Sequence, residues 1–412
     1  MARCELRLNL LLLLLLPACF DDTTGRQQQH AYESPVPQPG RRLAVINTDY
    51  KSSALSLLNL DNQARVGAAI LHSGSAVSQT STALSGDVVL ARTPLLDGRI
   101  ALVDRNNAVV TLFAPETRQT QQISVSTGFA ANPQDFAQVS AHKAYVTRLG
   151  RNTHPTATLD DWDEGDDVLL VDPQTAQVLG RIALQPYATS PELNASPTGI
   201  LVTPDRVWVN LLSDSTDFQH QGAARLVALD PQTDQVVQSL DVPTGRNCAL
   251  ANYLPMEKRF TLVCSGLYAD HAAQAARSAV VSVTQVGEEW TAKVLILATD
   301  LPGAHPFGAE AACVDGGHCL TVVPGDPNTG SKDALWRIEM DGGGATFVAN
   351  GSGAFYLTGL SADLVTSRIY ASDRGFSAGD VRVFTLSGSG TVIGTPIVSN
   401  PGGLGAVDLG RF

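Results

Sequence analysis

Residues 168–184 read Val168-Leu-Leu-Val-Asp172-Pro173-Gln-Thr175-Ala-Gln-Val-Leu-Gly180-Arg-Ile-Ala-Leu184, and this stretch decides the fold. It consists of a short apolar run, an Asp-Pro-x-Thr turn and a second apolar run, the pattern of two antiparallel strands joined by a hairpin. A second clear copy spans residues 226–240, and the pattern returns seven times along the chain. Self-similarity at a period of roughly 40–60 residues, with four short strands per repeat, indicates the blades of a β-propeller.

The strands of each repeat can be placed from this pattern. Seven runs rich in aliphatic and aromatic residues each follow a basic or turn residue, and we assign them to the second strand of seven blades: 42–46, 99–103, 143–147, 206–210, 259–263, 318–322 and 368–372. The third strands are then 54–59, 108–113, 168–171, 226–229, 279–283, 335–339 and 381–386. Because no long segment has a helical period, the pattern disfavours a helical-repeat solenoid.

The two ends of the repeat region predict how the ring closes. Each second strand should follow an inner strand, but the first blade has none before residue 41. Residues 401–409 have the inner-strand pattern and lie at the C-terminus. We therefore expect an all-β, seven-bladed propeller over residues 41–412, with the C-terminal strand completing blade one and removing exposed sheet edges.

The N-terminus has the features of an export signal. Basic residues precede an apolar run at 8–16, which is too short to span a bilayer because a spanning helix needs about 20 residues. The run ends Leu16-Pro17-Ala18-Cys19, which resembles a bacterial lipobox. The resemblance implies a signal peptide at 1–18, cleavage before Cys19 and lipid on the Cys19 sulfur. An ordinary secretory signal with an incidental cysteine is the alternative.

Residues 19–40 are polar, rich in proline and poor in aliphatic residues, so we interpret them as a disordered tether. The protein is expected to be extracytoplasmic and anchored to a membrane through lipid, with Phe20 favouring the outer over the inner membrane by resemblance to sorting rules. The 412 residues carry a net charge of −12, which disfavours nucleic acid as a partner. We expect a monomer.

A family resemblance supports this fold. The segment 143–147 reads Lys-Ala-Tyr-Val-Thr, and together with residues 168–175, 196–199 and 203–206 it resembles the YVTN-type bacterial propeller repeat. The resemblance covers roughly residues 41–412 and is best in blades three and four. It implies a secreted or envelope protein with a binding role, and because one fold hosts many functions it identifies no activity.

Four cysteines remain after Cys4 of the signal and Cys19 are set aside. Cys313 and Cys319 flank a turn in blade six, and Cys248 and Cys264 flank the equivalent hairpin of blade five. An oxidising compartment favours disulfides, so we predict the pairs Cys248–Cys264 and Cys313–Cys319. A zinc site that uses Cys313, Cys319 and His318 is the alternative.

The loops after the second strands contain candidate metal ligands. The acidic run of blade three suits calcium, which takes six to eight oxygen ligands, and three loop histidines suit zinc. The candidate ligands of Ca²⁺ or Zn²⁺ are Asp160, Asp161, Asp163, Glu164, Asp166, Asp167, His154, His220 and His271. The run lacks the spacing of an EF-hand. A solvated acidic loop and scattered, solvated histidines are the alternatives.

The same loops supply a candidate binding face, because five aspartates fall where second strands end and aromatic residues stand nearby. Its members are Asp49, Asp104, Trp162, Asp214, Phe218, Tyr268, Asp326 and Asp373. The sequence has no His-Glu-x-x-His motif and no phosphate-binding loop, and its one Gly-x-Ser-x-Gly match, at residues 375–379, lies between two predicted strands rather than between a strand and a helix. We therefore expect a non-catalytic platform that binds an envelope protein, a peptide or a glycan. A metal-assisted hydrolase or a lactonase-type propeller enzyme is the alternative.

Overall fold

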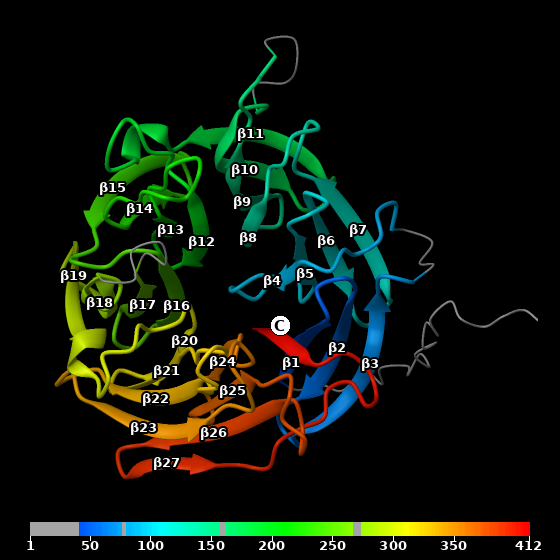
Figure 1. Ribbon diagram of the computed structural model, residues 1–412. Coiled ribbons are helices and arrows are strands. Elements are labelled where there is room, and N and C mark those ends of the chain that lie inside the picture. Colours follow the sequence, from blue (N-terminus) through cyan, green and yellow to red (C-terminus); the bar gives the residue numbers. More distant parts are fainter. Residues whose placement is uncertain (1–40, 76–79, 157–161, 267–272) are drawn as a thin grey trace, which may run out of the picture. The chain divides into compact units, whose positions relative to one another are not determined.

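The computed structural model describes residues 41–75, 80–156, 162–266 and 273–412. They form seven four-stranded antiparallel sheets, which Figure 1 shows as the blades of a ring. The fold is therefore the predicted all-β, seven-bladed propeller. The expected signal peptide, Cys19 and tether lie outside the described residues. Within the described ranges, no helix is long and apolar enough to cross a bilayer.

The blades follow one another along the chain, each from its inner to its outer strand. Blade one contains β28 (Ala406–Arg411), β1 (Arg42–Thr48), β2 (Ser53–Asn59) and β3 (Ala64–His72). Blade two contains β4 (Val88–Leu90), β5 (Ile100–Asp104), β6 (Val109–Ala114) and β7 (Gln119–Ser124). Blade three contains β8 (Pro133–Ser140), β9 (Lys143–Arg151), β10 (Gly165–Asp172) and β11 (Gln177–Ala183). Blade four contains β12 (Pro197–Val202), β13 (Val207–Leu211), β14 (Arg225–Asp230) and β15 (Gln235–Asp241).

The last three blades have the same plan. Blade five contains β16 (Cys248–Leu254), β17 (Arg259–Ser265), β18 (Ser278–Val286) and β19 (Glu289–Leu297). Blade six contains β20 (Ala311–Asp315), β21 (His318–Val323), β22 (Ala334–Glu339) and β23 (Ala345–Asn350). Blade seven contains β24 (Leu360–Asp363), β25 (Arg368–Ser372), β26 (Val381–Ser387) and β27 (Gly390–Ile393). Three 3-10 turns lie at Gln185–Tyr187, Ala275–Arg277 and Ala298–Asp300.

Burial explains the composition of the strands. The middle strands are packed on both faces between neighbouring blades, so β2 and β10 are buried at every residue. The outer strand β15 is covered on one face only, and its residues alternate between exposed and partly buried. Continuous apolar runs in the middle of each repeat, followed by an alternating run, are therefore what this architecture requires.

The C-terminal strand closes the ring as predicted. β28 pairs antiparallel with β1, with Val45 opposite Leu409, so blade one combines the two ends of the repeat region. The Asp408 carboxylate also accepts a hydrogen bond from the backbone N–H of Leu90 in blade two, with an N···O distance of 2.7 Å. The last strand therefore contacts both its own blade and the next one.

Buried aspartates connect successive blades near the third strands. Asp333 precedes β22 and accepts hydrogen bonds from the backbone N–H groups of Phe355, Tyr356 and Leu357, which lead into blade seven. Asp166 and Asp380 do the same for the segments that lead into β12 and β28. An unpaired buried amide costs about 1–3 kcal/mol, so these carboxylates stabilise the links between blades.

Two disulfides staple the hairpins of blades five and six, which confirms the predicted pairs Cys248–Cys264 and Cys313–Cys319. The cysteines of each pair lie opposite one another on neighbouring strands. The alternative zinc site is wrong, because both sulfurs of blade six are bonded to each other. The third proposed ligand, His318, places its Nδ1 atom 2.8 Å from a carboxylate oxygen of Asp315.

Deleting residues 401–412 should abolish cooperative folding. The deletion removes β28, exposes the edge of β1 and leaves the backbone N–H of Leu90 without its acceptor. We expect loss of the thermal unfolding transition, or aggregation, in circular dichroism and size-exclusion chromatography. A truncated chain that melts at the temperature of the intact chain would contradict ring closure by this strand.

Candidate functional site

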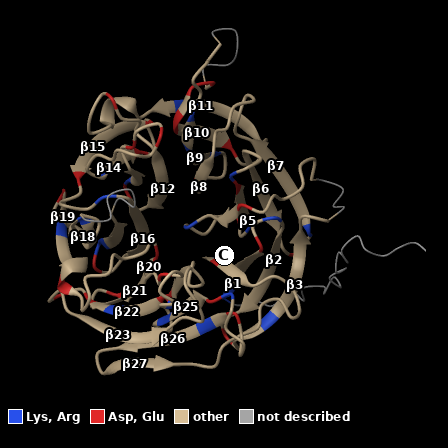
Figure 2. Ribbon diagram, in the orientation of Figure 1, with Lys and Arg blue, Asp and Glu red and all other residues tan. Residues whose placement is uncertain are grey.

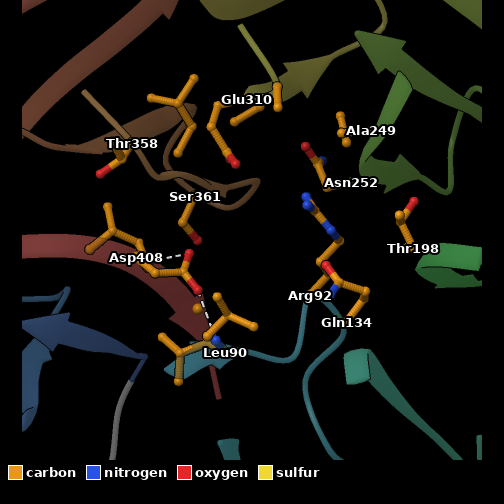
Figure 3. Close-up of a pocket in the computed structure, with 18 of the residues that line it drawn as sticks. Leu90, Arg92, Gln134, Thr198, Ala249, Asn252, Glu310, Thr358, Ser361 and Asp408 are labelled. Atoms are coloured by element: carbon orange, nitrogen blue, oxygen red, sulfur yellow. Dashed lines mark hydrogen bonds between the residues drawn. The ribbon is translucent and has the colours of Figure 1, made fainter. Parts of the chain in front are cut away.

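The inner strands of all seven blades surround a central cavity of about 690 Å³. This volume lies within the range of roughly 300–1,000 Å³ that is typical of small-ligand sites. The cavity is lined by glycine and apolar residues together with a smaller number of polar side chains. Figure 3 shows these polar groups, which include Arg92, Gln134, Asn252, Glu310, Ser361 and Asp408.

Arg92 reaches across the cavity from blade two. Its backbone N–H and its Nε atom lie 3.2 and 3.6 Å from the two carboxylate oxygens of Asp135 in blade three. Its Nη1 atom donates a 2.8 Å hydrogen bond to the carbonyl oxygen of Leu250 in blade five. Gly199 of blade four lies beside this crossing, and a Cβ atom there would make an ordinary contact of 3.6 Å with the Arg92 Nε atom. Among the described residues, the Nη2 atom of Arg92 has no hydrogen-bond partner.

Two further acids lie on the other side of the cavity. Glu310 precedes β20 and Asp408 belongs to β28, and both line the cavity wall with Arg92 (Figure 3). Burial raises the pKa of the Glu310 carboxyl to about 7, the positive charge of Arg92 opposes this shift, and the negative charge of Asp408 adds to it. Glu310 therefore changes its protonation state near neutral pH, as groups in ligand-binding and catalytic sites often do.

Asp135 holds Arg92 in place. Burial raises the pKa of its carboxyl to about 6, although Arg92 and the backbone amides of Ile200 and Phe136 favour the charged form. The hydrogen bond from the Ile200 N–H, 3.0 Å long, also links blades three and four. Asp135 is thus a positioning residue that fixes one end of the Arg92 side chain.

The five predicted loop aspartates lie at or after the ends of second strands, but most of their carboxylates are engaged within the fold. Asp104 is buried and accepts hydrogen bonds from the backbone and hydroxyl of Ser85. Asp373 is fully buried and binds Arg382 at 3.2 Å. Asp214 accepts a 2.7 Å hydrogen bond from Gln221.

Asp49 and Asp326 are different, because they hold the turns of their own exposed loops. Phe218 is 54% exposed and is free to contact a partner. Trp162 is partly buried, and its ring lies 5.7 Å from the guanidinium carbon of Arg148. Tyr268 lies outside the described residues. The binding face therefore stays a prediction, for which Asp49 and Phe218 offer exposed groups and Asp326 a partly exposed one.

The acidic run of blade three does not converge on one point in the part that the structure describes. Asp163 accepts hydrogen bonds from Thr127 and Thr156, and Asp166 binds the amides that precede β12. Asp167 forms a fully buried ion pair with Arg148 at 2.7 Å, while Glu164 binds Arg181 at the surface.

His154 and His220, the described histidines of the predicted metal set, are exposed in the loops of different blades. Asp160, Asp161 and His271 lie outside the described residues. Among the described residues, no three acidic, histidine or cysteine side chains could hold a metal ion together. Calcium or zinc binding by these loops stays a prediction.

No sequence motif marks the residues of the central cavity as a site. Asp135 and Asp408 stand inside segments with the inner-strand pattern, where a charged residue is unusual, and that position was the available signal. Glu310 stands in residues 308–313, which also have the inner-strand pattern, whereas Arg92 lies outside any motif. Nothing in the sequence shows that the two residues share a cavity. Charges of both signs are distributed around the whole ring, as Figure 2 shows, so composition does not mark the site.

No protein-family model matches this chain, and no curated protein sequence matches it either. Solved structures do match its fold. A proposed 6-phosphogluconolactonase from Bacteroides fragilis is 10% identical with a TM-score of 0.56, and the match covers 92% of this chain and all of that one. A proposed 6-phosphogluconolactonase from Bacteroides uniformis is 13% identical with a TM-score of 0.55, covering 91% of this chain and all of that one.

A hypothetical selenium-binding protein from Sulfolobus tokodaii is 10% identical with a TM-score of 0.57, and the match covers 91% of this chain and 94% of that one. At these identities the similarity establishes the propeller fold alone, and it transfers no activity to this chain.

The raised pKa of Glu310 predicts a pH-dependent stability. An acid whose pKa is higher in the folded state binds more protons when folded, so its contribution to the free energy of unfolding falls as the pH rises from about 4.5 to about 7. Glu310→Gln cannot ionise and escapes this loss. Relative to wild type, we expect the variant to gain about 1–3 kcal/mol between about pH 5 and pH 8 in urea unfolding.

The control for this measurement is Glu288→Gln, which removes the same charge from an exposed turn. It should follow the wild-type pH dependence. Parallel curves for Glu310→Gln and wild type would show that Glu310 titrates as an ordinary surface acid.

Proposed function

We propose that this protein is a lipid-anchored binding protein of the cell envelope, and that its ligand site is the central cavity. Arg92 carries the proposal, because it extends across a cavity of about 690 Å³ and keeps an unpaired Nη2 donor among the described residues. A charged donor held in place by Asp135 and Leu250 is pre-organised, which reduces the entropy cost of binding.

The chemistry of the wall supports a small polar ligand. Arg92 suits a carboxylate or another strong acceptor, whereas Glu310 and Asp408 suit hydroxyl or ammonium donors. The hydroxyl groups of Thr198, Thr358 and Ser361 stand among them. The cavity is too small for a folded partner, so the proposed ligand is the end of a peptide or a short glycan.

Replacing Arg92 should weaken binding. A panel of short peptides and oligosaccharides is first screened for ligands that raise the melting temperature of the full chain, and affinity is then measured by calorimetry. Losing a charge-assisted hydrogen bond costs about 1.5–3 kcal/mol, so we expect Arg92→Ala to bind roughly 10- to 100-fold more weakly. Arg92→Lys serves if the alanine variant is unstable.

Arg206→Ala is the matched control, because Arg206 lies in the turn after β12 and, among the described residues, its side chain bonds only to its neighbour Asp205. It should bind like wild type. A panel that leaves the melting temperature unchanged, or a ligand that binds Arg92→Ala as tightly as wild type, would contradict a ligand site in the cavity.

A hydrolase of the lactonase type is the second candidate, and the state of Glu310 favours it. A carboxyl with a pKa of about 7 is suited to accept a proton from water, and Arg92 would stabilise negative charge on the attacked carbonyl oxygen. For the metal-assisted form of this reaction, the described residues offer no converging ligand set.

This candidate predicts turnover of lactones or simple esters by the purified protein. Removing a general base costs about 10²- to 10⁴-fold in rate, so Glu310→Gln should lower kcat by at least about 100-fold. The fold would be unchanged, as judged by melting. Equal rates in wild type and Glu310→Gln would remove Glu310 from catalysis.

A further inference from the structure

Arg374 packs against two tyrosine rings, one of which lines the central cavity. It belongs to the loop between β25 and β26, and its guanidinium carbon lies 4.5 Å from the ring centre of Tyr356 and 5.5 Å from that of Tyr50. Tyr50 follows β1 and lines the cavity itself. The group formed by Tyr50, Tyr356 and Arg374, here called the tyrosine–arginine cluster, thus combines parts of blade one, blade seven and the link from blade six.

The backbone around the cluster holds it closely. The Tyr356 ring lies on Gly375, where a Cβ atom would approach the ring to 2.5 Å. The Arg374 backbone packs on Gly405, just before β28, and its N–H donates a 3.3 Å hydrogen bond to the carbonyl oxygen of Tyr356. Tyr50 is held with a φ of 65°, a left-handed conformation that is uncommon for a bulky residue, and its side chain is 56% exposed. The two rings and the surrounding backbone therefore restrict where the Arg374 guanidinium can lie.

The charge of Arg374 has no partner in the part of the chain that the structure describes. Its guanidinium donates no hydrogen bond there and forms no ion pair. Arg148 and Arg382 also lie over aromatic rings, but each binds a buried carboxylate, Asp167 and Asp373 respectively. The chain has a net charge of −12, so acidic partners for arginine are abundant. An arginine that is held in place without an acidic partner is therefore suited to bind an anion.

We propose that Arg374 is an oxyanion-binding subsite beside Tyr50, which lines the central cavity. The guanidinium lies over the rings of Tyr50 and Tyr356. Its N–H groups would bind a carboxylate or a phosphate, whose paired oxygens match the guanidinium fork. The subsite extends the proposed function. It rests on that function in one respect, namely that the anionic group bound at Arg374 belongs to a ligand whose remainder enters the cavity.

The test uses inorganic phosphate and acetate as probes, because the natural ligand is unidentified. Each is titrated into the full chain at constant ionic strength, and the saturable change in melting temperature gives a dissociation constant. We expect wild type to saturate, and Arg374→Ala to bind at least tenfold more weakly. Arg374→Lys should be intermediate, since lysine keeps the charge but lacks the fork. Tighter binding of phosphate points to a phosphate-bearing ligand, and equal or tighter binding of acetate to a carboxylate.

Two controls separate this subsite from the cavity. Lys293→Ala removes one positive charge from an exposed position on β19 and should not change anion binding. Arg92→Ala should keep phosphate binding at Arg374 even if it loses the cavity ligand. Anion binding that is lost in Arg92→Ala but kept in Arg374→Ala would overturn the subsite and leave the cavity proposal intact.

If Arg374→Ala proves unstable, Tyr50→Leu removes the exposed ring of the cluster and should also weaken anion binding. Non-saturable shifts in wild type, or equal affinities in wild type and both cluster variants, would overturn the proposal.

Discussion

The closure of the ring by β28 is the constraint on which the rest of the structure depends. Seven sheets can bury both faces of their middle strands only if the first blade also packs against the last. β28 meets this need by pairing with β1, and Asp408 on the same strand binds the backbone of blade two. Closure turns every inner strand towards one axis, and this arrangement creates the cavity and determines which residues line it.

A shared cavity changes what the same charged groups can do. In water, an arginine and several carboxylates a few ångströms apart interact weakly, whereas partial burial strengthens their interactions and shifts their pKa values. Burial raises the pKa of Asp135 to about 6 and that of Glu310 to about 7. Arg92 interacts electrostatically with acids from three blades, Asp135, Glu310 and Asp408. The charge of Arg92 and the protonation state of Glu310 are therefore coupled. This coupling, rather than the acidic loops, distinguishes the site.

The aspartates of the loops show why local sequence can mislead about function. Asp166 belongs to the acidic run of blade three, whose clustering in the sequence resembles a cation site, and Asp104 and Asp373 stand at or just after the ends of second strands. In the structure, each of the three accepts hydrogen bonds from the backbone, and they hold separate turns and links in different parts of the ring. A propeller must satisfy the amides that lead from one blade to the next, and aspartate is suited to that task because it is short and accepts several hydrogen bonds.

The sequence by itself determined the repeat, the strand order, the closing strand and the two disulfides. The repeat, the strand order and the closing strand depend on local patterns of burial and turns, which recur in each repeat. The disulfides join cysteines that are close together in the chain. Only the tertiary structure decided the site. Arg92 lies more than 200 residues before Glu310 and Asp408 in the sequence, and Arg374 meets Tyr50 only across the closed ring. Their convergence results from the geometry of the ring, and no short segment of sequence encodes a distance across it.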